Sequence, residues 1–130
     1  MESKAAIATI TNEVYATELK SGSHKLLADE PFDNGGKDLG PGPGDFVRMA
    51  LASCTAITLR MYSNRKNFAV QEIQVKVSSE EVEGKTIFHR DITITGTLDQ
   101  QQHKRMLHIA NACPVHKLLT NPIEIKTQLL

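Results

Sequence analysis

The sequence contains two cysteines, Cys54 and Cys113, and a thiol is a side chain whose reactivity depends strongly on its surroundings. Cys113 precedes Pro114, and a proline at the first position of a helix would make Cys113 the N-cap of that helix. At an N-cap the helix dipole and the unpaired backbone amides favour the thiolate. His116 lies close enough in the sequence to change the proton affinity of the Cys113 thiol. Cysteines on apolar faces are also commonly inert core residues, so the pattern alone leaves both interpretations open.

Other kinds of site fit the sequence less well. Cys113 and His116 have a spacing that could bind zinc, but two ligands are too few for a structural zinc site. A phosphate-binding loop needs Ser or Thr after its Gly-Lys pair, whereas Asp38 follows Gly36 and Lys37. A cysteine protease would need a general base and an orienting third group, which the sequence alone does not identify. The two cysteines stay the candidate reactive residues, and their spacing alone does not favour thiol chemistry over inert core packing.

The residues around Cys54 predict a helix that begins near Asp45. Apolar residues recur at spacings of three and four and form one helical stripe, which comprises Val47, Ala50, Cys54, Ile57 and Met61. Leu51 and Leu59 add apolar groups on the flanking faces. We therefore expect this helix to be central in the fold and largely buried.

The residues before this helix predict a long loop. Residues 29–44 hold five of the eight glycines and three of the five prolines, which disfavours both a helix and a central strand. A loop of this length in a compact domain is more often functional than accidental. A surface linker between two half-domains is the alternative.

The remaining elements predict an α+β fold. Short β-rich runs at 4–10, 13–19 and 24–28 predict a three-stranded meander. Alternating apolar and polar residues on both sides of Glu83-Gly84 predict a β-hairpin with one buried face. The order of β-rich segment, helix, hairpin and further helices predicts a single α+β domain over residues 1–130.

The C-terminal third predicts two helices and a strand. Asp99 and Gln102 resemble a capping box at the start of a helix, and that helix must end before Pro114. A short helix is expected over 114–119. Alternation after Pro122 predicts a final strand over 123–127.

Composition excludes several classes of partner. The 130 residues carry 15 basic and 15 acidic side chains, and aromatic residues make up 5%. Nucleic acids and anionic membranes both require a basic excess, so neither is an expected partner. The longest uncharged apolar run, residues 49–59, is far shorter than the roughly 20 residues that span a bilayer. Residues 1–4 do not resemble a secretory leader, so we expect a cytoplasmic protein with free thiols.

Two long segments of the sequence resemble the OsmC/Ohr family, the osmotically inducible and organic hydroperoxide resistance proteins. They are SHKLLADEPFDNGGKDLGPGPGDFVRMALASCTAITLRMYSNRK and ITGTLDQQQHKRMLHIANACPVHKLL. The resemblance runs from about residue 23 to the end of the chain, and it is strongest to the general OsmC-like branch.

The resemblance implies a fold, an activity and roles for the two cysteines. The fold would be an intertwined homodimer whose long central helices pack between two sheets, with active sites at the dimer interface. The activity would be reduction of organic hydroperoxides by Cys54 as the peroxidatic cysteine and Cys113 as the resolving cysteine. An external dithiol would reduce the resulting disulfide, and no metal, flavin or haem would be needed.

Two positions depart from the family pattern. The characterised peroxidases hold the thiolate with an Arg in the N-terminal strand region, whereas residues 1–47 contain no Arg, and Lys20 or Lys25 is the candidate substitute. The family also has a Glu ten residues before the first cysteine, where this chain has Gly44, so Asp45 is the candidate carboxylate. We therefore expect Cys54 to keep a raised pKa and peroxidase turnover to be slow.

Two alternative functions remain open at this point. One is a dimer of the same fold that binds a small apolar or thiol-reactive molecule without efficient turnover. The other is a structural or regulatory dimer whose cysteines are inert.

Overall fold

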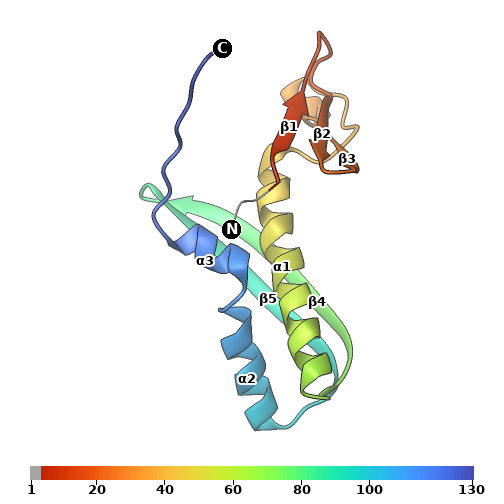
Figure 1. Cartoon of the computed structure of the whole chain (residues 1–130), viewed down its shortest axis with the longest axis vertical. Helices are drawn as coiled ribbons and strands as arrows, with labels where there is room; N and C mark the ends of the chain where they lie inside the picture. Colours follow the sequence, from red (N-terminus) through yellow and green to blue (C-terminus); the bar gives the residue numbers. More distant parts are fainter. Residues whose placement is uncertain (1–3) are drawn as a thin grey trace. The chain divides into compact units, whose positions relative to one another are not determined.

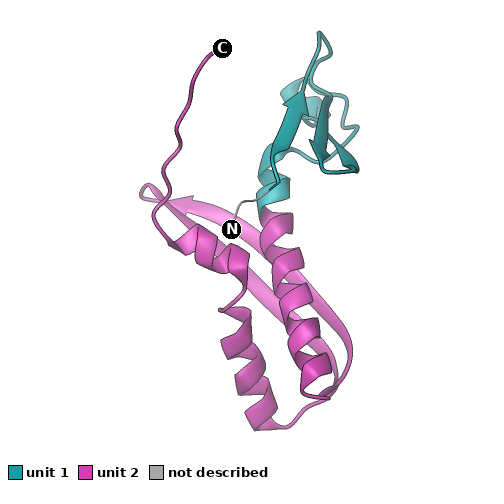
Figure 2. Ribbon diagram, in the orientation of Figure 1, with its two compact units in different colours: residues 1–47 teal, residues 48–130 magenta. Residues whose placement is uncertain are grey.

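The computed structural model describes residues 4–130, which divide into two compact units on either side of residue 47. Figure 2 shows the first unit in teal and the second, residues 48–130, in magenta. The long helix α1 (Pro43–Arg65) begins in the first unit and continues through the second. Within residues 4–130, no helix combines the length and apolar character that crossing a membrane requires.

The first unit contains the three-stranded antiparallel meander that the sequence predicts. Its strands are β1 (Ala6–Thr9), β2 (Thr17–Ser21) and β3 (His24–Ala28), in the order β1-β2-β3. The second strand begins later than predicted because the Tyr15 backbone N–H donates to the Asp29 side chain and not to a neighbouring strand.

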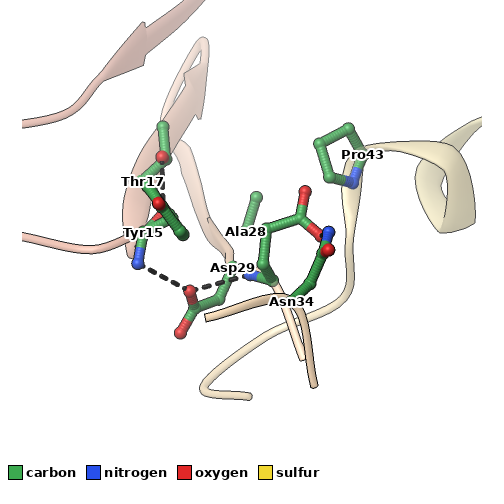
Figure 3. Close-up of a pocket in the computed structure, with 7 residues that line it drawn as sticks. Tyr15, Thr17, Ala28, Asp29, Asn34 and Pro43 are labelled. Carbon is green, nitrogen blue, oxygen red and sulfur yellow. Dashed lines mark hydrogen bonds between the residues drawn. The ribbon is translucent and has the colours of Figure 1, made fainter. Parts of the chain in front are cut away.

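The loop after β3 is organised around the carboxylate of Asp29. This side chain is buried, and its Oδ1 accepts hydrogen bonds from the backbone N–H groups of Tyr15 at 3.1 Å and Glu30 at 2.8 Å (Figure 3). Its Oδ2 accepts the Leu39 N–H at 3.1 Å. The short 3-10 helix η1 (Phe32–Asn34) lies within the same loop. The predicted loop is therefore ordered by the Asp29 carboxylate together with backbone hydrogen bonds, among them the Asp38 N–H to the Glu30 carbonyl oxygen at 3.1 Å.

Two glycines of this loop are required by close backbone approach. A Cβ at Gly36 would collide with the carbonyl oxygen of Glu30, and a Cβ at Gly40 would collide with that of Leu27. The concentration of glycine that predicted a loop thus has a specific packing cause.

The buried face of α1 differs from the predicted one. The helix buries Leu51, Thr55, Leu59 and Tyr62, whereas Ile57 and Met61 of the predicted stripe are 54% and 67% exposed. Two apolar faces were available on this helix, and the face with the flanking leucines packs against the rest of the second unit. The expectation that Cys54 lies on the buried stripe is therefore only partly correct, because its side chain is half-buried.

The second unit packs helices on a long β-hairpin. The hairpin consists of β4 (Ala69–Val82) and β5 (Lys85–Thr97), and α2 (Gln100–Ala110) and α3 (Pro114–Thr120) follow it (Figure 1). The core includes Leu59 and Tyr62 from α1 and Met106 and Ala110 from α2. Partly buried apolar residues of the hairpin pack against this core, among them Ile73, Ile92 and Ile94.

The helix boundaries of the second unit confirm the sequence signals. Asp99 and Gln102 form the predicted capping box at the start of α2. Cys113 is the N-cap of α3, with Pro114 in the first turn as predicted.

The predicted final strand is wrong. Residues 121–130 form no strand and are exposed, with Ile125 at 84% exposure. A strand requires a hydrogen-bonded neighbour, and neither of the two sheets in residues 4–130 pairs with this segment.

Candidate functional site

The fold brings the two thiols together. Cys54 lies in the middle of α1 and Cys113 lies at the N-terminus of α3, and the first turn of α3 contacts both sulfurs. Both are free thiols. Cys113 is completely buried and Cys54 is half-buried, so Cys54 is the more accessible sulfur.

The first turn of α3 supplies one backbone amide to each sulfur. Pro114 has no N–H, so the next two residues carry the first available donors. The Val115 N–H donates to Cys54 Sγ at 3.5 Å, and the His116 N–H donates to Cys113 Sγ at 3.3 Å. The sequence Cys-Pro-Val-His therefore positions both sulfurs at the end of a helix where negative charge is favoured.

Arg90 of β5 lies directly behind this pair. Its guanidinium donates to Thr55 Oγ1 at 3.1 Å and to Asn111 Oδ1 at 2.7 Å, and it lies 3.2 Å from His116 Nδ1. The Thr55 hydroxyl in turn lies 3.8 Å from Cys113 Sγ. A single cation thus connects α1, the end of α2 and α3 around the buried thiol.

These contacts shift the two thiol pKa values in opposite directions. Burial raises the pKa of Cys113, but the His116 N–H, the Cys54 thiol, the Thr55 hydroxyl and the charge of Arg90 outweigh it, so the net shift is downward. Burial also raises the pKa of Cys54, and the neighbouring Cys113 raises it further. The first negative charge on the pair is therefore favoured on Cys113.

The imidazole of His116 is held in its neutral form. Burial lowers the pKa of this side chain, and the charge of Arg90 lowers it further. Because a guanidinium can only donate, Nδ1 of His116 accepts from Arg90 and the ring hydrogen resides on Nε2.

The predicted site residues fall into two groups. Cys54, Cys113 and His116 gather in the second unit. Lys20 and Lys25 are exposed cross-strand partners in the first unit. The Asp45 carboxylate, also in the first unit, accepts the Gly42 N–H at 2.9 Å. The roles of these three residues at the thiol pair remain predictions.

Sequence reasoning missed Arg90, although a signal was present. Position 90 continues the alternation of Phe88, Ile92 and Ile94 on the inward side of the hairpin. A charged residue in a register otherwise occupied by apolar side chains indicates a buried partner. The family pattern instead directed attention to an arginine within residues 1–47.

Metal ligands are not grouped in the described part of the chain. Among residues 4–130, no three His, Cys, Asp or Glu side chains lie close enough together to hold a metal ion. The chemistry available at this site is that of the two sulfurs and the donors around them.

Comparisons with known proteins identify a matching family and similar folds. The family model described as OsmC-like protein matches residues 35–128. A search of curated proteins finds no match. A structure from Psychrobacter arcticus, described as that of an osmotic stress induced and detoxification response protein, is 21% identical with a TM-score of 0.75, over 91% of this chain and 89% of that one.

Two further structures are similar over nearly the whole chain. An OsmC-like protein from Vibrio cholerae is 18% identical with a TM-score of 0.72, over 92% of this chain and 95% of that one. An organic hydroperoxide resistance protein from Legionella pneumophila, also described as a predicted redox protein, is 20% identical with a TM-score of 0.64, over 92% and 90% of the two chains. These likenesses establish the fold.

Proposed function

The chain belongs to the OsmC-like family, and from this premise we propose that it is a thiol-dependent peroxidase that reduces organic hydroperoxides with Cys54 and Cys113. The observation that carries the proposal is the pair of free thiols that accept neighbouring backbone N–H groups from the first turn of α3. The similar Legionella pneumophila protein is named for organic hydroperoxide resistance, which supports the same substrate class. The proposed compartment is the cytoplasm, where dithiol reductants regenerate thiols.

In the first step Cys54 attacks the peroxide. Cys54 is the more accessible sulfur, and its proton passes to the neighbouring Cys113 thiolate. The Cys54 thiolate then attacks the terminal oxygen of the hydroperoxide, and the O–O bond breaks. The departing alkoxide takes the proton from Cys113 and leaves as an alcohol. Cys54 becomes a sulfenic acid, and Cys113 is again a thiolate.

In the second step Cys113 resolves the sulfenic acid. Its thiolate, stabilised by the His116 N–H and by Arg90, attacks the sulfur of Cys54. A disulfide forms, and hydroxide leaves and is protonated to water. An external dithiol then reduces the disulfide by thiol–disulfide exchange and restores both thiols.

We propose that the working form is a homodimer. Ile57 and Met61 present exposed apolar groups on the face of α1 that also contains Cys54. A second copy of the chain would bury this face and reduce the access of water to the reacting sulfur. Sedimentation should give a dimer, and a stable monomer near 14.3 kDa would contradict this assembly.

Lys20, Lys25 and Asp45 are proposed as auxiliary groups. Replacing Lys20 or Lys25 by Met should lower the rate if that ammonium helps to hold a thiolate, and Arg at the same position should raise it. Unchanged rates in all of these variants would leave Arg90 as the cation that acts on the thiol pair.

A second candidate function is binding without efficient turnover. The raised pKa of Cys54 favours it, because little of this accessible sulfur is a thiolate at neutral pH. A similar organic hydroperoxide resistance protein from Vibrio cholerae holds captopril in one of its active sites. The ligand here would be a small apolar or thiol-reactive molecule that occupies the space around Cys54.

Hydroperoxide consumption distinguishes the two functions. The purified chain is mixed with cumene hydroperoxide and a dithiol reductant, and peroxide loss is followed over many equivalents. A peroxidase consumes peroxide catalytically, with a rate that rises with pH as the Cys54 thiolate forms. Consumption that stops after one equivalent, or that equals the rate in reductant alone, would favour binding without turnover.

A further inference from the structure

A cavity of about 450 Å³ lies beside the thiol site, and it has two chemically different sides. Its apolar lining comes from α1, β5, α2 and α3 and comprises Leu51, Phe88, Ile92, Leu107 and Leu119. Its polar lining includes Arg90, Asn111 and His116. The volume lies within the range of small-molecule pockets, and a few polar groups on an apolar wall are typical of such sites.

The charge of Arg90 has no counterion within the described chain. Its three hydrogen-bond partners, Thr55, Asn111 and His116, are all neutral acceptors. No carboxylate among residues 4–130 forms an ion pair with this guanidinium. A guanidinium has five N–H groups, so two remain without an acceptor in residues 4–130. A half-buried guanidinium without a counterion favours the binding of an anion from outside the chain.

Two further donors line the same side of the cavity. Because His116 Nδ1 accepts from Arg90, its Nε2 carries a hydrogen and is a donor. Asn111 accepts from Arg90 through Oδ1, which leaves the N–H groups of its side-chain amide as donors. The polar side of the cavity thus presents one fixed positive charge and several N–H groups, a combination that suits a carboxylate.

We propose that this cavity binds a small organic carboxylate, whose head pairs with Arg90 and His116 and whose hydrocarbon chain packs against the apolar lining. This inference goes beyond the proposed function, because binding requires neither a peroxide nor turnover. The site is separate from the sulfurs but shares Arg90 and His116 with them.

Sharing Arg90 couples the cavity to the thiol pair. The guanidinium stabilises the Cys113 thiolate, so a bound carboxylate and that thiolate compete for one cation. The titratable groups that contact or surround Arg90 are His116 and Cys113, and Cys54 titrates together with Cys113. His116 is already neutral above its lowered pKa. Ionisation of the thiol pair is therefore the event that weakens carboxylate binding as the pH rises above 7.

Calorimetric titration with hexanoate, and with hexanol as the neutral analogue, tests the cavity directly. Hexanoate should bind the reduced wild-type chain at pH 7 at least about tenfold more tightly than hexanol does, because the carboxylate gains charge-assisted hydrogen bonds. Equal affinity for the two probes, or no binding of hexanoate, would overturn the proposal.

Three variants locate the site. Arg90→Gln should lose the preference for hexanoate, whereas Lys76→Gln removes one charge from the outward face of the same hairpin and should retain it. Thr86→Glu places a carboxylate at an exposed position of the lining and should weaken hexanoate binding even if Arg90→Gln fails to fold. Hexanoate binding that survives Thr86→Glu, or that is lost in Lys76→Gln, would place the ligand elsewhere.

The coupling between carboxylate binding and ionisation of the thiol pair can be measured separately. Hexanoate affinity in the wild type should fall between pH 7 and pH 9 as the thiol pair ionises, and Cys113→Ser should remove most of that fall. A pH dependence that is the same in both proteins would contradict the coupling. Failure of the peroxidase assay would leave these binding results unaffected, so the two proposals are tested separately.

Discussion

Asp29 and the thiol pair are two places where backbone amides hold a side chain that can carry negative charge. Asp29 accepts three backbone N–H groups at 2.8–3.1 Å, shared between its two oxygens. Cys54 and Cys113 accept one backbone N–H each, at 3.5 and 3.3 Å. The carboxylate lies in the first unit and the sulfurs lie in the second.

The two places differ in what remains available for chemistry. Burial raises the pKa of Asp29, but the backbone donors outweigh it and the pKa falls below its ordinary value of 3.8, so the group is a permanent anion at neutral pH. The two neighbouring thiols have pKa values shifted in opposite directions, so a proton can move between them. A fully coordinated anion fixes a loop, whereas a partly coordinated pair of nucleophiles can react.

Replacement of Cys54 should cause the greatest loss of peroxidase activity. Cys54→Ser should abolish peroxide turnover, because a serine hydroxyl is neither ionised at neutral pH nor able to form a sulfenic acid. The measurement is cumene hydroperoxide consumption with a dithiol reductant, with circular dichroism as the check on folding. Turnover that persists in this variant would mean that Cys113 alone is sufficient.

Cys113→Ser should separate the two steps. The accessible sulfur can still be oxidised, so about one oxidation event per site is expected, and regeneration should be slow because the resolving thiol is missing. Peroxide consumed per chain and the mass of the oxidised protein report this outcome. Full catalytic turnover would show that the external dithiol reduces the sulfenic acid directly.

Arg90→Gln should raise the pKa of Cys113 by about one unit, since an opposite charge nearby typically lowers a pKa by one to three units. The matched control is Arg90→Lys, which keeps the charge and should restore most of the shift. The measurement is thiolate absorbance against pH in a Cys54→Ser background, where Cys113 titrates alone. Identical titration curves with and without the Arg90→Gln substitution would show that Arg90 does not lower the pKa of Cys113.

Asp29→Asn should affect stability and not thiol chemistry. Because the pKa of Asp29 in the folded chain is below 3.8, the ionised carboxylate stabilises the fold above that value. This contribution is lost as the pH falls through the folded pKa. The wild type should therefore lose more of its Tm than the variant between about pH 7 and about pH 3, at unchanged Cys113 titration. Equal losses would show that the loop does not depend on this charge.

The sequence predicted much of the fold from local signals. The capping box at Asp99, the N-cap at Cys113 and the hairpin around Glu83-Gly84 each depend on residues close together in the chain, and the structure confirms them. The buried face of α1 was not predictable in this way, because two apolar faces competed and the choice depends on packing with β5 and α2. The strand predicted over 123–127 failed for the same reason, since strand formation requires a distant partner.

The candidate site shows the same contrast between features with a sequence signal and features that depend on contacts between distant residues. Family resemblance singled out Cys54 and Cys113, and the structure places both at the first turn of α3, while their catalytic roles stay a prediction. The partners of Arg90 were not predictable, because Thr55 and His116 lie 35 and 26 positions away in the sequence. A cation in an inward-facing register of a hairpin is the signal that would have found it.

We propose that the two thiols act as one redox site. The direct test is to treat the reduced wild-type chain with one equivalent of cumene hydroperoxide and to map its peptides by mass spectrometry. We expect one intramolecular Cys54–Cys113 disulfide and one molecule of alcohol per chain. Two unmodified thiols, or a separate sulfinic acid on Cys54 with Cys113 still free, would contradict it.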